Sequence, residues 1–420
     1  MLLIKNGYCI NSEKEGYFDI LVDGDRIAKI DKNMEGSFDE VIDAKDCIVM
    51  PTFCNAHTHL AMSLFRGLAD DLELMDWLNN HIFPAEAKYV NKDMVYICSK
   101  LSMLEGIRSA TGCFYDMYFF EEEVAKAAIE IGVRTIIGEG IIDFPTPDCK
   151  TPKDAIEKTK SLKREFKDSN LIKVSYAPHS TYTLSEDTLK MVADALDDND
   201  IVQIHINESK REVELVKSQK GKRPLEVLND TGLLTDRTFM AHCVETDDEE
   251  IDLIKEKNAK VINVPQSNFK LASGIAPICK MVKKGIDVYI GTDGPASNNN
   301  LDMIEEIRTS SLVQKVKFGE KAMSSKTILK LASNFDGLFD GAGYLKEGNF
   351  ADIAIISLDG IESVPIYNPH SFIAYALNSR DVRDVIVSGR VILKNREFVD
   401  IDEEEVKFKV RELSKSLGGL

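Results

Sequence analysis

CIVMPTFCNAHTH, residues 47–59, joins an apolar β-like run to two histidines, His57 and His59. Successive side chains of a β-strand point to opposite faces, so residues two apart share a face and these two imidazoles can reach one metal ion. An isolated H-x-H pair is also compatible with two solvated or hydrogen-bonded histidines. The placement of the other polar residues along the chain therefore decides what this pair does.

Length, composition and charge exclude several classes of protein. The chain has 420 residues, of which 44% are hydrophobic and 29% charged, as expected for a globular protein. This length suits a large α/β barrel with an accessory domain. The formal net charge of −18 predicts repulsion from phosphate backbones and anionic membranes, so we expect no nucleic acid and no membrane as a partner. The apolar run within residues 1–7 is too short for a signal peptide or a membrane span, and we expect a cytoplasmic protein.

The cysteines lack the spacing of a disulfide framework or of a zinc knuckle. No C-x-x-C pair occurs, and most of the cysteines lie in apolar stretches. We therefore expect buried, reduced thiols and no cysteine ligand. The eight cysteines are Cys9, Cys47, Cys54, Cys98, Cys113, Cys149, Cys243 and Cys279.

The order of β-like and helical segments predicts an α/β fold, a (β/α)8 TIM barrel with a small β-sandwich domain. Residues 1–50 and 346–420 are rich in short strands and turns, and we expect them to form one composite β-domain that includes a terminal helix over 402–417. Within residues 51–345, eight apolar runs alternate with helical stretches such as 151–167, 186–196 and 248–257. The runs end near His57, Asp116, Gly140, Ala177, Ile206, Cys243, Val264 and Thr292.

The chain has only seven histidines, and five of them lie at or just beyond the carboxyl ends of the expected strands. In a parallel barrel those ends share one rim, so residues far apart in sequence become neighbours around a single mouth. His81 and His370 lie outside this pattern, and we expect them to be structural. The five at the rim are His57, His59, His179, His205 and His242.

Asp293, after the eighth run, adds a carboxylate to the same rim. Read alone, Asp293-Gly294 is a turn sequence, but its coincidence with the histidines favours a ligand. Three imidazoles and one carboxylate with an open position suit one catalytic divalent metal ion, with Zn²⁺ as the first choice and Fe²⁺ or Mn²⁺ as alternatives. The predicted ligands are His57, His59, His205 and Asp293.

Glu208 follows the ligand His205 by three residues and is the predicted general acid and base. A water activated at neutral pH needs such a proton acceptor, although most glutamates are simply solvated. His242 is predicted to orient the water or stabilise charge in the reaction, with a satisfied core histidine as the alternative. His179 is expected to contact substrate rather than metal.

Together these motifs resemble the amidohydrolase superfamily. The motifs are residues 51–59, His205-x-x-Glu208, His242 and residues 291–294, with residues 343–353 resembling the return into the β-domain. Within the superfamily the chain is most similar to the branch of 5′-methylthioadenosine/S-adenosylhomocysteine deaminases and 5′-deoxyadenosine deaminases. The resemblance implies a hydrolase that converts 5′-substituted adenosines to inosine-type products and ammonia, with catalytic roles for Glu208, His242 and Asp293. It also implies a homo-oligomer.

The resemblance carries over further residues. Trp77 and Glu86 match the Trp…Pro-x-Glu segment of the branch, which implies that Glu86 binds the ribose hydroxyls and that Trp77 lines the pocket, although a tryptophan that packs a helix is an equal alternative. Relatives with two metals have a carboxylated lysine at the end of the fourth strand. Here Lys173 begins that strand, which implies a single metal.

Glu139 is expected to govern which adenosine is used. Relatives that accept S-adenosylhomocysteine are expected to have an arginine where this chain has Glu139, and Arg134 lies at the opposite end of the same strand. A carboxylate at Glu139 disfavours a substrate tail that ends in a carboxylate. We therefore expect 5′-deoxyadenosine or 5′-methylthioadenosine to be preferred over S-adenosylhomocysteine.

Two other functions stay open at the level of sequence. One is a sister amidohydrolase that acts on guanine, a triazine or another heterocycle without ribose. The other is a catalytically silent barrel used as a scaffold, which the presence of all four ligands and Glu208 disfavours.

Overall fold

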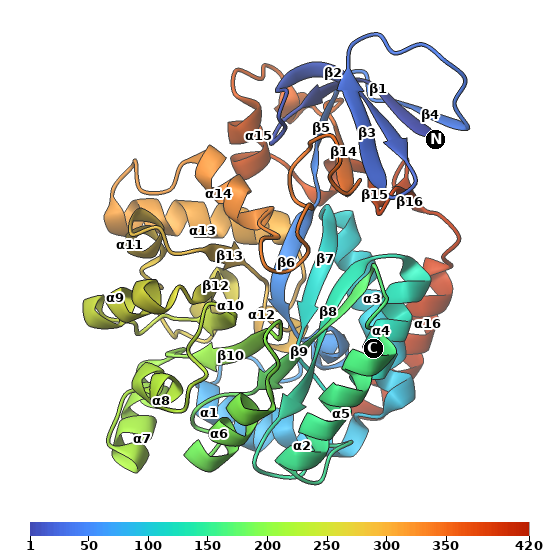
Figure 1. Cartoon of the computed structure of the whole chain (residues 1–420). Coiled ribbons are helices and arrows are strands. Elements are labelled where there is room, and N and C mark those ends of the chain that lie inside the picture. Colours follow the sequence, from blue (N-terminus) through green and yellow to red (C-terminus); the bar gives the residue numbers. More distant parts are fainter. Residues whose placement is uncertain (420) are drawn as a thin grey trace.

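The computed structural model describes residues 1–419 and contains two sheets. Eight parallel strands follow one another in chain order around a barrel, so the predicted (β/α)8 architecture is confirmed (Figure 1). The barrel strands are β6 (Phe53–Thr58), β7 (Thr111–Asp116), β8 (Arg134–Ile141), β9 (Ile172–Pro178), β10 (Val202–Ile206), β11 (Thr238–His242), β12 (Lys260–Asn263) and β13 (Val288–Ile290).

The barrel closes between its last and first strands through residues next to the predicted ligands. The backbone N–H of Asp293 donates to the carbonyl of His57 (2.9 Å), and the N–H of Thr292 donates to Asn55 Oδ1 (3.0 Å). A Cβ atom on Gly291 would lie 2.7 Å from the backbone nitrogen of His57. Because that contact is too short for any side chain, Gly291 lets the first and last strands approach closely.

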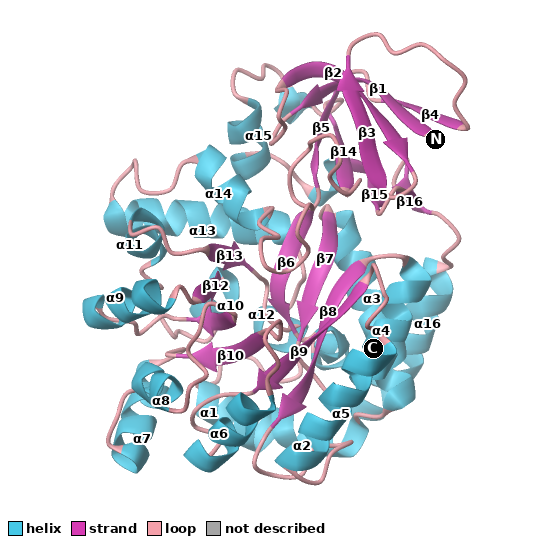
Figure 2. Ribbon diagram, in the orientation of Figure 1, coloured by secondary structure: helices cyan, strands magenta, loops and turns pink. Residues whose placement is uncertain are grey.

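Helices surround the strands (Figure 2). The three helical stretches expected from periodicity are confirmed as α5, α6 and α9, and capping boxes at Thr151 and Asp247 begin two of them. The barrel helices are α3 (Lys92–Arg108), α4 (Glu121–Ile131), α5 (Pro152–Glu165), α6 (Glu186–Ala195), α7 (Lys210–Lys220), α8 (Pro224–Asp230), α9 (Asp248–Lys257), α10 (Pro265–Lys270), α11 (Ile278–Lys283), α12 (Pro295–Asn298), α13 (Met303–Phe318) and α14 (Ser325–Ala332).

A long excursion between β6 and α3 contributes much of the wall of the catalytic cavity described below. Its elements are the 3₁₀-helix η1 (Leu60–Phe65), α1 (Leu74–Trp77), the π-helix η2 (Leu78–Ile82) and α2 (Phe83–Tyr89). Asn91 caps the following helix α3 by accepting from the N–H of Met94 (3.1 Å). The excursion therefore starts at the end of β6, the strand that bears His57, and ends at the N-cap of α3.

The two chain ends form one sheet of nine strands (Figure 1). The predicted β-domain of both termini is thus confirmed, but hydrogen bonding runs continuously through a single sheet instead of two sheets of a sandwich. Register shifts such as the one between Ile4 and Gly7 interrupt the pairing and let the sheet curl over its own core. The strands are β1 (Leu2–Cys9), β2 (Gly16–Asp23), β3 (Arg26–Asp31), β4 (Glu40–Asp43), β5 (Cys47–Pro51), β14 (Ile353–Ser357), β15 (Val382–Val387), β16 (Arg390–Lys394) and β17 (Glu397–Phe398).

The terminal helix α16 (Glu403–Ser414) packs against α3 of the barrel (Figure 1). Its assignment to the β-domain was therefore wrong. Val406 and Val410 form its buried stripe, and Glu403 pairs with Arg108 of α3 (2.5 Å). An amphipathic pattern predicts that a helix buries one face but does not say against which element.

The short helices of the C-terminal region complete the chain. They are η3 (Ile361–Ser363), α15 (Pro369–Tyr375), η4 (Ser379–Asp381) and η5 (Lys415–Leu417). Of these, α15 packs against α13 and α14. Within residues 1–419, no helix combines the length and the apolar character needed to cross a membrane.

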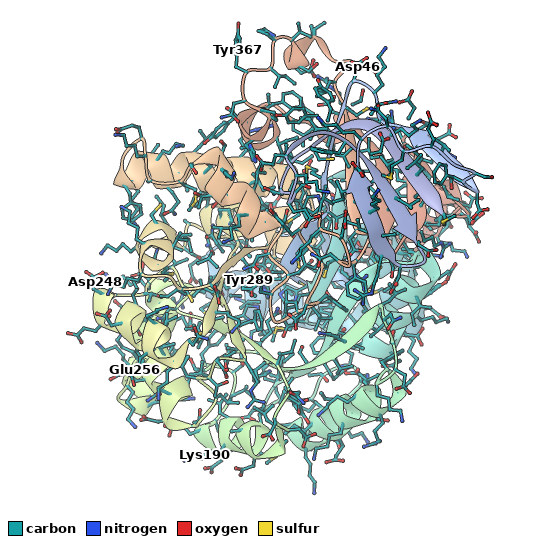
Figure 3. The ribbon with its side chains drawn as sticks, turned by 45° about the horizontal axis from the view of Figure 1, so that its top comes forward. Asp46, Lys190, Asp248, Glu256, Tyr289 and Tyr367 are labelled. Carbon is teal, nitrogen blue, oxygen red and sulfur yellow. The ribbon has the colours of Figure 1, made fainter. Side chains whose placement is uncertain are left out.

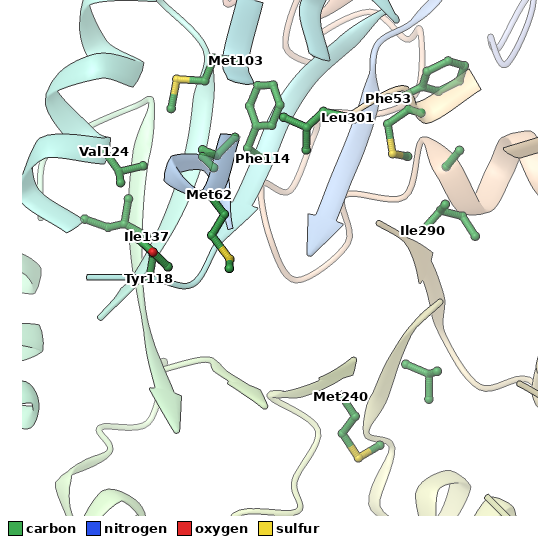
Figure 4. Close-up of a cluster of buried hydrophobic side chains, with 14 of the residues drawn as sticks. Phe53, Met62, Met103, Phe114, Tyr118, Val124, Ile137, Met240, Ile290 and Leu301 are labelled. Carbon is green, nitrogen blue, oxygen red and sulfur yellow. The ribbon is translucent and has the colours of Figure 1, made fainter. Parts of the chain in front are cut away.

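The core is continuous from the barrel strands to the surrounding helices. Phe53, Phe114, Ile137 and Ile290 belong to one apolar cluster (Figure 4), whereas charged residues such as Asp248, seen in Figure 3, lie on the outside. All eight cysteines are buried and free, as expected.

A buried ion pair joins the barrel to the terminal sheet. Arg134 at the start of β8 donates to Asp352 from Nε (2.6 Å) and Nη2 (3.3 Å), and both side chains are almost fully buried. Arg134 also donates to the carbonyl of Asn170 (2.6 Å). This arginine therefore serves the domain interface, at the end of the strand opposite to the predicted site.

Candidate active site

The four predicted metal ligands come together at the carboxyl end of the barrel. One possible ligand atom from each of His57, His59, His205 and Asp293 lies within 4.8 Å of the others. Asp293 Oδ1 lies 3.4 Å from His57 Nε2 and 3.3 Å from His59 Nε2. The parallel topology thus unites residues from the first, fifth and eighth barrel strands.

Hydrogen bonds orient all three imidazoles. His57 Nδ1 bonds to Gln203 Oε1 (2.9 Å), His59 Nδ1 to the carbonyl of Met117 (2.5 Å) and His205 Nδ1 to the carbonyl of His179 (2.7 Å). An Nδ1–H held by an acceptor leaves the Nε2 lone pair free, and these Nε2 atoms face the shared space. The tautomer of each ring is therefore the one that binds a metal.

The residues present fit a divalent cation. His57 Nε2 is fully buried and has no hydrogen-bond partner. A buried polar atom without a partner is costly, and a cation bound by the Nε2 lone pair relieves that cost. Asp293 Oδ2, the other carboxylate oxygen, accepts from the hydroxyls of Ser267 (2.6 Å) and Ser297 (3.0 Å), which hold the carboxylate in place.

Glu208 lies beside this cluster and has the properties of a proton carrier. Burial, together with the nearby Asp293 carboxylate, raises the pKa of Glu208 to about 8. A carboxyl group with a pKa close to neutrality both accepts and returns a proton efficiently. The backbone N–H of Glu208 donates to Glu212 Oε2 (2.6 Å), which holds the loop that bears it.

His242 closes the same side of the site. Its Nδ1 bonds to Asn268 Oδ1 (2.8 Å), and its Nε2 lies 3.8 Å from Glu208 Oε2. Burial lowers the pKa of His242, so the imidazole is neutral. A neutral ring with its Nδ1–H engaged presents an acceptor at Nε2 to the site.

A cavity of about 690 Å³, including the solvent-open space at its mouth, contains the site. His59, His205, His242, Glu208 and Asp293 line one part of it. The excursion after β6 supplies much of the remaining wall, namely Leu74, Trp77, Leu78, Ile82, Phe83 and Glu86. A mainly apolar cavity with a few convergent polar groups is the usual form of a small-molecule site.

The expected substrate residues Glu86, His179 and Trp77 all line this cavity. Burial raises the pKa of Glu86 to about 7. Burial and the neighbouring imidazoles lower the pKa of His179 to about 3, so His179 is neutral. His179 Nδ1 lies within hydrogen-bond distance of the hydroxyls of Ser180 (3.2 Å) and Thr183 (3.1 Å).

Comparison with known proteins agrees with this geometry. The model of the amidohydrolase family matches residues 48–392. The chain belongs to the amidohydrolase family. It is 42% identical to the 5-methylthioadenosine/S-adenosylhomocysteine deaminase of Aquifex aeolicus over 98% of this chain and 96% of that protein. It is 41% identical to the protein of the same name from Pyrococcus horikoshii, over 92% and 93% of the two chains. It also matches the crystal structure of an adenosine deaminase from Xanthomonas campestris with bound zinc, with a TM-score of 0.95, 32% identity and coverage of 99% and 98%.

One predicted substrate residue of this amidohydrolase lies outside the cavity. Glu139 is fully buried on the outer side of β8, where Lys158 Nζ lies 3.1 Å from its carboxylate. Its strand neighbour Gly140, by contrast, lines the cavity. Because side chains alternate along a strand, Glu139 must point to the opposite face, toward the helices. The expectation that Glu139 meets the substrate tail was wrong.

Several supporting residues escaped the sequence analysis. Gln203 lies two residues before His205 on the same strand, so the alternation of side chains could have placed it beside the ligands. Asn268, Ser267 and Ser297 come from other elements, and no local pattern points from them to His242 and Asp293, which they contact. Glu212 follows Glu208 closely in sequence and holds its loop.

Proposed function

We propose that this amidohydrolase hydrolytically deaminates 5′-substituted adenosines to inosine-type products and ammonia, using one divalent metal ion. The observation that carries the proposal is the cluster of His57, His59, His205 and Asp293. His59, His205 and Asp293 line one cavity together with the buried Glu208 and a second carboxylate, Glu86. The names of the relatives in Aquifex aeolicus and Pyrococcus horikoshii support the substrate class.

His57, His59, His205 and Asp293 would hold the metal, with Zn²⁺ as the first choice and Fe²⁺ or Mn²⁺ as alternatives. When bound, a divalent cation supplies Lewis-acid chemistry that lowers the pKa of a water molecule. A single ion is proposed because Lys173 lies at the amino end of β9, with its ammonium 5.0 Å from the centre of the Phe339 ring. The zinc in the Xanthomonas campestris structure supports the choice of ion.

Glu208 carries the protons of the reaction. It takes one proton from the attacking water and delivers it to N1 of the adenine ring, while the water oxygen bonds to C6. Glu208 then moves the hydroxyl proton to the amino group, the C6–N bond breaks and ammonia leaves. The product retains the proton on N1 and a carbonyl at C6, so atoms and charge balance.

The neighbouring groups orient the reactants. His242 Nε2 accepts a hydrogen bond from the attacking water, because its Nδ1–H is held by Asn268. Asp293 is proposed to support the tetrahedral intermediate beside its role as a ligand. The Glu86 carboxylate accepts hydrogen bonds from the ribose hydroxyls, and His179 and Trp77 complete the substrate wall.

An ammonia-release screen tests the proposal. The substrates are adenosine, 5′-deoxyadenosine, 5′-methylthioadenosine and S-adenosylhomocysteine, with guanine and a triazine as representatives of sister enzymes. We expect turnover of the nucleosides that is lost in Glu208→Gln and kept in Glu214→Gln, an exposed position on α7. Turnover of guanine or the triazine alone would replace the proposal with the sister activity. The expected homo-oligomer stays a prediction, which light scattering of the same sample tests.

A further inference from the structure

Glu306 on α13 is a fully buried residue that is not among the described residues lining the catalytic cavity. Its Oε2 accepts a hydrogen bond from the backbone N–H of Gln266 (3.3 Å), and its Oε1 accepts one from Asn298 Nδ2 (2.6 Å). A buried carboxyl group is costly unless its oxygens are bonded. These two bonds therefore tie α10, which bears Gln266, and α12, which bears Asn298, to α13.

The two residues bonded to this carboxyl group are direct neighbours of the two serines that hold Asp293. Gln266 precedes Ser267, and Asn298 follows Ser297. The hydroxyls of Ser267 and Ser297 donate to Asp293 Oδ2 at 2.6 Å and 3.0 Å, and the two hydroxyl oxygens lie 3.0 Å apart. A single carboxyl group thus fixes both elements that hold the Asp293 carboxylate.

The backbone of Asp293 also depends on its surroundings. Its φ of 63° lies in the left-handed region, which is uncommon for residues other than glycine and persists only where neighbouring groups hold it. The N–H of Asp293 donates to the carbonyl of His57 (2.9 Å), and its carbonyl accepts from the hydroxyl of Thr292 (2.8 Å). Asn298 Nδ2 donates to the carbonyl of Thr292 (2.9 Å) as well as to Glu306. Glu306 is therefore connected to the backbone of Asp293 as well as to its carboxylate.

We propose that Glu306 is a positioning residue for Asp293 and acts on its carboxylate through Ser267 and Ser297. The inference rests on the proposed function, in which Asp293 is a metal ligand. The two serines hold Oδ2, and this directs Oδ1 toward the imidazoles of the site. Without Glu306, α10 and α12 lose their common anchor, the two hydroxyls lose their alignment, and the carboxylate is no longer held in the orientation that binds a cation.

The first test measures Zn²⁺ affinity of the full chain by competition with a chelator. Glu306→Met keeps a similar side-chain length but removes both acceptors, and we expect it to lower the affinity by about tenfold or more. Glu306→Gln keeps an acceptor for Asn298 Nδ2, so its loss should be smaller. Asp19→Leu is the matched control, because Asp19 is also buried and its carboxylate accepts from the N–H groups of Asn6 (2.9 Å) and Met34 (2.8 Å) in the terminal sheet. We expect Asp19→Leu to leave the Zn²⁺ affinity unchanged.

The second test asks whether Glu306 acts through the serines. Glu306→Met is combined with Ser267→Ala and Ser297→Ala, and in that background we expect it to change the Zn²⁺ affinity by less than about threefold, because the contacts that transmit its effect are already gone. An equal loss with and without the serines, or no loss from Glu306→Met alone, overturns the inference. If Glu306→Met fails to fold, Glu306→Gln in the same two backgrounds decides the question by the same criteria.

Asp293→Ala separates this inference from the proposed function. If Asp293→Ala loses Zn²⁺ affinity but Glu306→Met does not, the proposed ligands stand and only the role of Glu306 is refuted. If Asp293→Ala keeps the affinity of the unaltered protein, the proposed ligand set is refuted, and the role of Glu306 is refuted with it.

Discussion

Gln203 is predicted to control metal affinity through the orientation of His57. Its side chain is fully buried, its Oε1 bonds to His57 Nδ1 (2.9 Å) and its Nε2 donates to the carbonyl of Ala56 (3.0 Å). Gln203→Met keeps a similar length and volume but removes both bonds, so the ring loses the acceptor that sets its tautomer. Removal of such a partner typically weakens metal binding by about 10- to 100-fold, or about 1.4–2.7 kcal/mol.

The same substitution also leaves two buried polar groups without partners, the Nδ1–H of His57 and the carbonyl of Ala56. Each costs about 1–3 kcal/mol, so the metal-free protein is expected to lose about 2–6 kcal/mol of unfolding free energy. Gln314 on α13 offers a matched control. It is equally buried and makes two comparable bonds, from Nε2 to the carbonyl of Ala276 (2.9 Å) and to Oε1 from the N–H of Cys279 (3.1 Å).

Two measurements separate the effects. Urea unfolding of the metal-free proteins reports stability, and competition for Zn²⁺ against a chromogenic chelator reports affinity. We expect both variants to lose stability and only Gln203→Met to lose affinity. Unchanged affinity in Gln203→Met, or the same loss in Gln314→Met, would refute the reasoning that the glutamine acts through His57.

Three further outcomes follow from the structure. Glu208→Gln is expected to lower kcat by about 10²- to 10⁴-fold with metal content unchanged in elemental analysis, whereas full turnover would remove Glu208 from the proton path. Arg134→Met is expected to cost about 3–5 kcal/mol in urea unfolding because it leaves the buried Asp352 carboxylate unpaired, and adding Asp352→Leu should restore most of that loss; an undiminished deficit in the double variant would contradict the charge argument. Burial raises the pKa of Glu86 to about 7 from its usual 4.5, so in this window the folded protein holds a proton that the unfolded chain releases. Stability should therefore fall by up to about 3 kcal/mol as pH rises from about 5 to about 8, and Glu86→Gln should remove that part of the slope in unfolding curves.

The barrel and the grouping of the four proposed metal ligands could be predicted because both depend on local patterns. Apolar runs of strand length, separated by room for a helix, specify a parallel barrel, and a position at the end of a strand can be read from the run that precedes it. The ends of parallel strands must share one rim, so His57, His59, His205 and Asp293 become neighbours whatever their separation in sequence. The sequence alone did not indicate that Glu86 lines the cavity. Only the resemblance to a family predicted it.

The direction of the Glu139 side chain could not be read from the sequence. All eight residues of β8 are buried, so both faces of the strand meet protein and no alternation of polar and apolar residues marks the inner one. The packing of α16 against α3 could not be predicted for a related reason. An amphipathic stripe is compatible with any apolar surface.

The sequence by itself thus determined the fold class, and it predicted the proposed ligands and Glu208 as the proposed proton carrier from residue type and from place along a strand. Only the tertiary structure decided which groups orient the site residues, since Gln203 reaches His57, Asn268 reaches His242 and two serines reach Asp293 from separate elements. It also decided what surrounds the site beyond Glu86, where two segments distant in sequence, residues 83–87 and 144–147, line a second space. Such a space exists only when packing brings both segments together, and for that reason no local pattern predicts it.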